Sequence, residues 1–128
     1  MASLKPVKTT VMLIIEQAGK GILLRQRPQT GIWGGLWSFP EVETINDALP
    51  LLQREVGHEH ANVEQLGSFR HTFSHYHLDI TPVHLILNRL PTLVQEDSVH
   101  WYNNDSESAI GLAAPVKKLL NLITREQP

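Results

Sequence analysis

Apolar and polar positions along the chain form short runs that predict a sheet of several strands. Residues 7–16 are rich in Val, Thr and Ile, and their apolar side chains fall on both faces, which indicates a strand covered on both sides. Gly19 and Gly21 mark a turn, from which a second strand returns. We expect strands at residues 7–16, 22–27, 36–39, 63–73, 75–87 and 98–102.

A helix is predicted over residues 46–56, where the apolar spacing changes. Leu49, Leu52 and Val56 share one face of such a helix. Asn46 is placed to cap its first turn, because a short polar side chain can accept a hydrogen bond from the free backbone N–H groups there.

A second helix is predicted near the end of the chain. Ala114 opens it, and Pro115 stands at its first position, where proline is favoured. The expected buried stripe consists of Val116, Leu119, Leu120 and Ile123. Strands interrupted by two helices predict an α+β fold, an α-β-α sandwich in which helices flank a mixed β-sheet. The length suits one domain over residues 7–128, after a start or linker segment at residues 1–6.

Composition and charge narrow the function classes. Eleven Lys and Arg residues against thirteen Asp and Glu residues give a net charge of −2 with His neutral. Because duplex DNA is held largely by Lys and Arg that neutralise phosphates, such a domain should bind DNA weakly on its own. The absence of cysteine excludes a disulfide, a thiolate zinc site and an iron–sulfur cluster within the chain. No apolar run is long enough to span a bilayer, so we expect a cytoplasmic monomer without a membrane partner.

The segment from Gly35 to Glu41 resembles the opening of the Nudix box, the metal-binding motif of diphosphate hydrolases. The continuation is broken, because the Arg-Glu pair that ends in Glu55 comes too late and His58-Glu59 stands where the box has two glutamates. Such hydrolysis needs clustered carboxylates to hold a divalent metal and activate water. We therefore expect a Nudix-like fold without the metal site.

Histidines gather in residues 69–84. In extended backbone alternate residues share a face, so His75, His77 and Asp79 are placed to converge, as a metal site would require. Their spacing matches no strong ligand pattern, and we expect no metal there.

An aromatic ring, a hydroxyl and an imidazole stand side by side at Phe73, Ser74 and His75, where one predicted strand gives way to the next. This set can stack on a base, hydrogen-bond to a base edge and contact a phosphate. Ser74 and His75 do not suit a nucleophile and its base, because neighbours in extended backbone point to opposite faces. From the residues alone, an ordinary strand end with a core Phe, a turn Ser and an exposed His explains the set better.

A longer pattern runs through four segments, residues 24–28 (LRQRP), 31–40 (GIWGGLWSFP), 69–80 (FRHTFSHYHLDI) and 111–116 (GLAAPV). In this order, and across nearly the whole chain, they resemble the C-terminal domain of the MutY family of A/G-specific adenine DNA glycosylases. The resemblance implies a Nudix-like fold, similar to that of the 8-oxoguanine nucleotide hydrolases, and accounts for the broken box. It also implies recognition of 8-oxoguanine opposite adenine in duplex DNA, as part of base excision repair.

Carried over residue by residue, the Phe-Ser-His loop of that family falls on Phe73, Ser74 and His75, with Arg70 and His71 as candidates for supporting contacts. The catalytic carboxylates, the helical DNA clamp and the 4Fe–4S cluster of the family lie in an N-terminal domain. The resemblance thus implies a non-catalytic part of a glycosylase, without a cofactor of its own, acting in cis with a catalytic domain. Two alternatives stay open: an active Nudix hydrolase of oxidised nucleoside triphosphates, and a scaffolding domain that docks onto the catalytic half or another protein.

Overall fold

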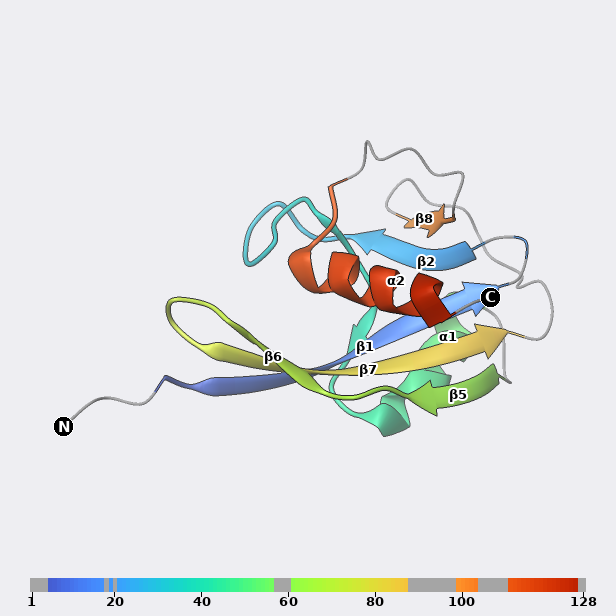
Figure 1. The fold of residues 1–128 in the computed structure, drawn as a ribbon, viewed down its shortest axis with the longest axis horizontal. Helices are drawn as coiled ribbons and strands as arrows, with labels where there is room; N and C mark the ends of the chain where they lie inside the picture. The colour runs from blue at the N-terminus through green and yellow to red at the C-terminus, as the bar shows by residue number, and fades with distance from the viewer. Residues whose placement is uncertain are drawn as a thin grey trace.

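The computed structural model of the chain describes residues 5–17, 19, 21–56, 61–87, 99–103 and 111–126. Within them, eight strands form one mixed sheet and two α-helices pack against it (Figure 1). The strands are β1 (Val7–Gln17), β2 (Gly21–Gln26), β3 (Trp37–Ser38), β4 (Glu41–Val42), β5 (Ala61–Gln65), β6 (Phe69–Thr72), β7 (His77–Leu87) and β8 (Val99–Tyr102). The helices are α1 (Ala48–Val56), entered through the short 3-10 helix η1 (Ile45–Asp47), and α2 (Ala114–Glu126). No helix in the described part of the chain has the length and apolar character needed to cross a membrane.

The two longest strands, β1 and β7, lie side by side at the centre of the sheet. They run parallel, from Val7 opposite His77 to Gln17 opposite Leu87. Residues 11–15 of β1 are all buried, which agrees with the predicted strand covered on both faces. β2 continues the sheet on one side of this pair, with β3 and β8 beyond it, while β5 and β6 pair with β7 on the other side.

β5 and β6 pair with β7 on either side of Pro82, which lies within β7. The sequence predicts one strand over residues 63–73, which is wrong, because the pairing with β7 stops between residues 65 and 69. A proline has no N–H to donate to the facing strand. Its carbonyl oxygen still accepts a hydrogen bond from the Leu66 N–H at 2.9 Å, so the missing donor faces this gap. β6 therefore forms a separate hairpin with the first half of β7.

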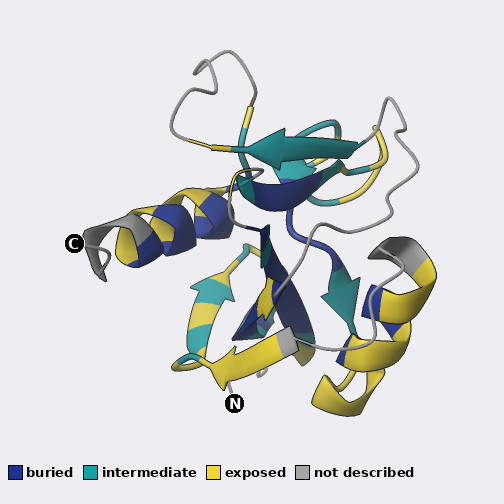
Figure 2. Cartoon of the chain, turned by 90° about the vertical axis from the view of Figure 1, so that its right-hand side faces the viewer, coloured by how far each residue is buried: buried dark blue, intermediate teal, exposed yellow. Residues whose placement is uncertain are grey.

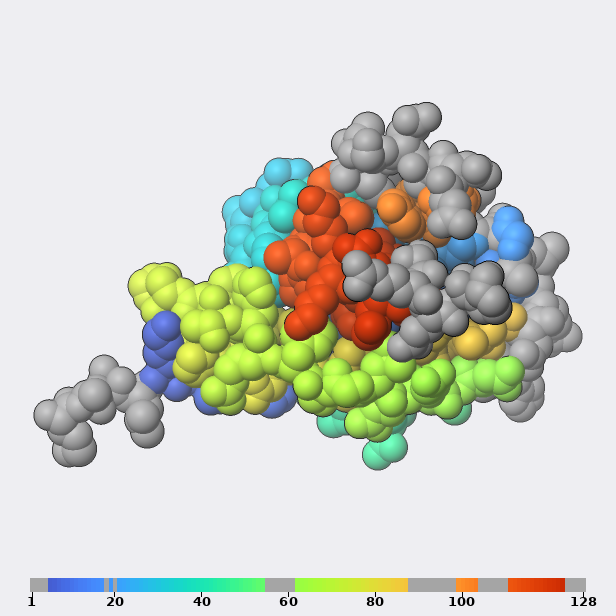
Figure 3. Space-filling view, in the orientation of Figure 1, coloured from blue at the N-terminus to red at the C-terminus, as the bar shows by residue number. Residues whose placement is uncertain are grey.

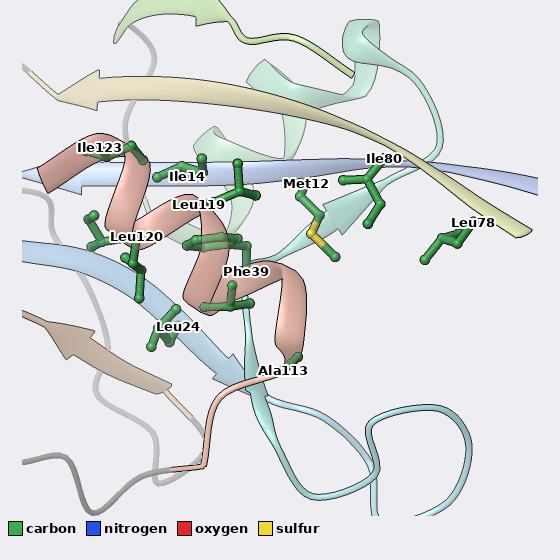
Figure 4. Packing of buried hydrophobic residues seen from close by; sticks show 12 residues of the cluster. Met12, Ile14, Leu24, Phe39, Leu78, Ile80, Ala113, Leu119, Leu120 and Ile123 are labelled. Atoms are coloured by element: carbon green, nitrogen blue, oxygen red, sulfur yellow. The ribbon is translucent and has the colours of Figure 1, made fainter. Parts of the chain in front are cut away.

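The two helices cover opposite faces of the sheet, which confirms the predicted α-β-α sandwich (Figures 1 and 2). The stripe predicted for α2 is buried and packs on alternate residues of the central strands (Figure 4). This cluster includes Met12, Ile14, Leu24, Phe39, Leu78, Ile80, Val116, Leu119, Leu120 and Ile123. The cluster under α1 includes Val11, Leu13, Ile15, Leu23, Ala48, Leu51, Leu52, Val83, Leu85 and Leu87.

The start of α1 differs from the prediction. Thr44 rather than Asn46 stands at the cap, and its backbone N–H donates to Asp47 Oδ2 at 3.2 Å. Asn46 lies inside η1, and Leu49, predicted to share a face with Leu52, is 46% exposed while Leu52 is fully buried. The buried residues of this helix are Ala48, Leu51 and Leu52. The buried face thus passes through Ala48 and Leu51 rather than Leu49, and the side chain of Val56 lies outside the described residues.

The β6–β7 hairpin and the start of β1 extend past the helices as a three-stranded arm, which we define as residues 5–10 and 69–80 (Figures 1 and 3). The N-terminal residues run along the hairpin, because the His77 N–H donates to the Pro6 carbonyl oxygen at 2.9 Å. Lys5 Nζ also donates to the carbonyl oxygen of Phe73 at 3.1 Å. The arm thus carries the segment that the sequence singled out.

Candidate nucleic-acid interface

The tip of the arm is a turn of residues 73–76 that joins β6 to β7. It is closed by a hydrogen bond of 2.8 Å from the Phe73 N–H to the Tyr76 carbonyl oxygen. Ser74 and His75 occupy the two central positions of the turn, and both are exposed. The structure therefore presents these two predicted site residues to solvent at the end of the arm.

Phe73 is half-buried beneath this turn, in a group of aromatic rings. Its ring centroid lies 5.1 Å from that of Trp33, 4.8 Å from that of His71 and 4.8 Å from that of Tyr76. Tilted and edge-on pairs at such distances stabilise a fold by about 0.5–1.5 kcal/mol each beyond their burial. The ring thus supports the turn from below, and stacking on a base would require it to leave these neighbours.

Trp33 reaches the arm from the loop of residues 28–36. It is the one non-glycine residue with a positive φ, +52°, in the described part of the chain. A non-glycine residue held in this region costs of order 1–3 kcal/mol and persists only where its surroundings fix it. The Trp33 ring lies 5.3 Å from that of His71 as well as against Phe73. Two segments far apart in the sequence therefore meet under the turn.

Arg27 ties this loop to the sheet. Its Nε donates to the carbonyl oxygen of Ile32 at 3.1 Å, and its Nη1 lies 2.7 Å from Glu41 Oε2. The guanidinium also stands over the Trp33 ring, 5.8 Å from the centroid. Glu41 in turn accepts a hydrogen bond of 3.3 Å from the Thr10 hydroxyl of β1. The loop is thus anchored to two strands of the sheet.

Glycines allow the same loop to fold back tightly. A Cβ added at Gly34 would collide with the carbonyl oxygen of Gln29, and Gly35 has φ +75°. The Gly35 N–H donates to the Pro28 carbonyl oxygen at 3.0 Å, which closes the turn. The loop therefore depends on backbone approaches that a side chain would prevent.

The two predicted supporting residues lie on opposite faces of the arm. His71 is half-buried among the aromatic rings. Arg70 forms two hydrogen bonds with Asp79, from Nε to Oδ1 at 2.7 Å and from Nη2 to Oδ2 at 3.1 Å. The hydrogen bond from Arg70 lowers the pKa of Asp79, and the same pairing raises the pKa of Arg70. The structure therefore brings His71 beneath the turn, while the charge of Arg70 is engaged by Asp79.

Two lysines of the arm add positive charge beside the turn. Lys5 reaches the Phe73 carbonyl oxygen, and Lys8 Nζ lies 4.5 Å from the centroid of the Tyr76 ring. Reasoning from the sequence did not single out either lysine. The signal that would have found them is the parallel pairing of β1 with β7, which is a tertiary contact and leaves no trace in the local pattern.

The glutamate that opens the Nudix-like box serves in an ion pair. Glu41 binds Arg27, and a cavity of about 230 Å³ beside them is lined by both side chains. His58, Glu59 and the side chain of Glu55 lie outside the described residues. The part of the box that the structure describes thus presents a neutralised carboxylate rather than a carboxylate available for a metal.

The three arm residues considered for a metal site, His75, His77 and Asp79, all lie in the described part of the chain. His77 Nδ1 lies 2.9 Å from the Thr72 hydroxyl, and Asp79 binds Arg70. His75 stands in the turn rather than in the strand that carries the other two. Among the described residues, no three His, Asp or Glu side chains are grouped closely enough to hold a metal ion.

Comparison with known proteins shows which family the chain belongs to. The sequence model described as NUDIX domain matches residues 10–122. The chain belongs to the NUDIX domain family. This NUDIX domain is 31% identical over 118 residues to the adenine DNA glycosylase of Buchnera aphidicola subsp. Baizongia pistaciae, a match that covers 92% of the chain and 33% of that relative. It is 30% identical over 141 residues to the adenine DNA glycosylase of Homo sapiens, which covers 99% of the chain and 26% of the relative.

A solved structure agrees with these matches. The C-terminal domain of mouse MUTYH, solved in complex with human PCNA, has a TM-score of 0.74 and 25% identity to this NUDIX domain, with 91% of this chain and 87% of that chain covered. The predicted resemblance to the C-terminal region of adenine DNA glycosylases is therefore confirmed. The chain spans a third or less of the length of these curated relatives.

Proposed function

We propose that this NUDIX domain recognises 8-oxoguanine paired with adenine in duplex DNA, as the lesion-reading part of an adenine DNA glycosylase. The observation that carries the proposal is the exposed pair Ser74 and His75 at the tip of an arm that extends past both helices. The match to the C-terminal region of adenine DNA glycosylases supports the substrate.

The chemistry of the lesion suits a serine at this tip. Guanine offers two hydrogen-bond acceptors in the major groove, its position-7 nitrogen and its oxo group. Oxidation at carbon 8 turns that nitrogen into a donor and places a carbonyl next to it. A hydroxyl can accept as well as donate, so Ser74 can receive the new N–H, whereas an Arg or Lys has no acceptor to offer. Ser74 can therefore hydrogen-bond to the oxidised edge of the base, from which an Arg or Lys cannot accept.

Binding to the DNA backbone is shared with another domain in this proposal. Lys5, Lys8 and His75 can contact phosphates near the tip, but the whole chain has a net charge of −2. A domain of this charge needs further cations to hold duplex DNA at physiological salt. We infer that a catalytic domain in cis supplies them, together with the adenine-removing chemistry and the iron–sulfur cluster implied by the resemblance.

Ser74→Ala tests the proposal when the chain is joined to the catalytic domain of an adenine DNA glycosylase. Adenine removal is measured opposite 8-oxoguanine and opposite guanine. We expect the preference for the oxidised partner to fall by about 1–3 kcal/mol, roughly 5- to 150-fold, which is the usual worth of one good base contact. The free energy of unfolding should change by less than about 0.5 kcal/mol, because the side chain is exposed.

Ser68→Ala is the matched control. Ser68 is also an exposed serine of the same hairpin region, but its hydroxyl lies 3.0 Å from that of Thr81, away from the turn. This variant should keep the preference. Equal losses on both substrates in Ser74→Ala, or no loss at all, would contradict the role of the turn and favour a scaffolding domain. Magnesium-dependent pyrophosphate release from 8-oxo-dGTP by the isolated chain would instead favour a nucleotide hydrolase.

A further inference from the structure

We propose that Trp33 is a positioning residue for the turn of residues 73–76, which it braces from a separate loop. The inference rests on the proposed function, since it concerns how Ser74 and His75 are presented to DNA. It adds a residue that touches neither the base nor the phosphate and acts through Phe73.

Within the arm, Phe73 is held by the rings of His71 and Tyr76 and by Lys5, which donates to its carbonyl oxygen. The arm extends past both helices, and β6 contributes four residues to it. One backbone hydrogen bond, from Phe73 to Tyr76, closes the turn. A contact site on such an extension reads DNA well only if its groups are held in place before binding, because each side chain that must be ordered on binding weakens the interaction.

Trp33 adds support from outside the arm. Its ring contacts the rings of Phe73 and His71, at 5.1 Å and 5.3 Å between centroids. Phe73 is the first residue of the turn, so the contact reaches the turn through the Phe73 side chain. The φ of Trp33, +52°, is a conformation that persists in a non-glycine residue only where its surroundings fix it, and the contacts of its ring and loop do so.

The brace is itself attached to the body of the domain. Arg27 holds the carbonyl oxygen of Ile32, next to Trp33, and lies over the indole ring. The Leu36 N–H donates to the Trp33 carbonyl oxygen at 3.0 Å. Through Glu41, the same arginine is connected to the sheet. A continuous series of contacts therefore leads from the sheet, through Arg27 and Trp33, to the turn of residues 73–76.

Variants of Trp33 test the brace with two readouts. Trp33→Leu removes the aromatic ring, and Trp33→Gly removes it while relieving the backbone. In the fused enzyme, both should lower the preference for 8-oxoguanine over guanine by roughly 3- to 10-fold, the equivalent of ordering one or two side chains on binding. Trp33→Phe keeps an aromatic ring and should restore most of the preference. In the chain alone, amide hydrogen exchange at Phe73 should become faster in Leu and Gly variants.

Trp37→Leu is the control for the loss of an indole. Trp37 is half-buried nearby in the sequence, but its ring lies 6.0 Å from His100 and away from the turn. It should leave both readouts unchanged.

Unchanged exchange at Phe73 and unchanged preference in folded Trp33→Leu and Trp33→Gly would overturn the inference. If Ser74→Ala leaves the preference intact, the proposed function fails instead, and faster exchange at Phe73 would still support the brace as a structural contact.

Discussion

Replacing Arg27 by Met removes the cation that connects the loop of residues 28–36 to the sheet. In the native chain its guanidinium lies 2.7 Å from the Glu41 carboxylate and 3.1 Å from the Ile32 carbonyl oxygen. Methionine fills similar space along the side-chain stem but donates no hydrogen bond. The substitution leaves Glu41 with the Thr10 hydroxyl as its hydrogen-bond donor among the described contacts.

The expected cost follows from the burial of the pair. The side chains of Arg27 and Glu41 are 22% and 26% exposed, so solvent screens them less than a surface pair. At an effective dielectric constant of about 20, unit charges about 4 Å apart attract by about 4 kcal/mol, and partial desolvation cancels much of this. Hydrogen bonds to charged groups contribute about 1.5–3 kcal/mol net. We expect Arg27→Met to lower the free energy of unfolding by about 2–3 kcal/mol.

Urea unfolding followed by far-UV circular dichroism measures this, in a cycle with Glu41→Met and the double variant. The double variant should lose about 1–2 kcal/mol less than the sum of the single variants, because each single change already breaks the pair. A cycle on Arg70 and Asp79, whose side chains are 48% and 36% exposed, should show a smaller coupling. If the losses at Arg27 and Glu41 add within about 0.3 kcal/mol, the ion pair between them does not stabilise the fold and the reasoning is refuted.

Two further predictions concern the loop and the arm. Gly34→Ala should lower the free energy of unfolding by about 1–3 kcal/mol, because the new methyl group meets the Gln29 carbonyl oxygen, while Gly67→Ala, with open space around it, should change it by less than about 0.5 kcal/mol in the same urea assay. Because the hydrogen bond from Arg70 lowers the pKa of Asp79, the stabilisation by this pair is complete at neutral pH and is lost as the pH falls through that lowered pKa. Thermal melts of the native chain and Asp79→Asn should therefore differ at neutral pH and converge in acid, and a difference that persists in acid would contradict this assignment.

Elements with a strong local pattern were predictable from the sequence. Residues 11–15 are apolar on both faces and form the buried centre of β1, and the predicted stripe of α2 is buried. Leu49 was misplaced because apolar residues at 48, 49, 51 and 52 offer two overlapping stripes, and their spacing does not say which of the two faces the sheet. The gap at Pro82 was missed because its effect falls on the neighbouring strand rather than on its own.

Only part of the candidate site could be predicted from the sequence. The residue types of Ser74 and His75 suggested a contact with nucleic acid, but their local pattern fits an ordinary strand end better, and only the resemblance to a family favoured the site. Trp33 and Lys8 gain their positions from contacts between segments that the local pattern does not connect. Such contacts depend on the parallel pairing of β1 with β7 and on the path of one glycine-containing loop.

These contacts show what Glu41, at the opening of the broken Nudix-like box, does in this structure. Glu41 stands where the box would open, yet its carboxylate neutralises Arg27, and Arg27 fixes the loop that carries Trp33. Trp33 in turn packs on Phe73, the first residue of the turn. A residue at a position associated with metal-dependent hydrolysis is thereby connected to the proposed reading turn by direct contacts. If this connection is functional, Arg27→Met should speed amide exchange at Phe73 as Trp33→Leu does, although Arg27 touches no residue of the turn in the described contacts.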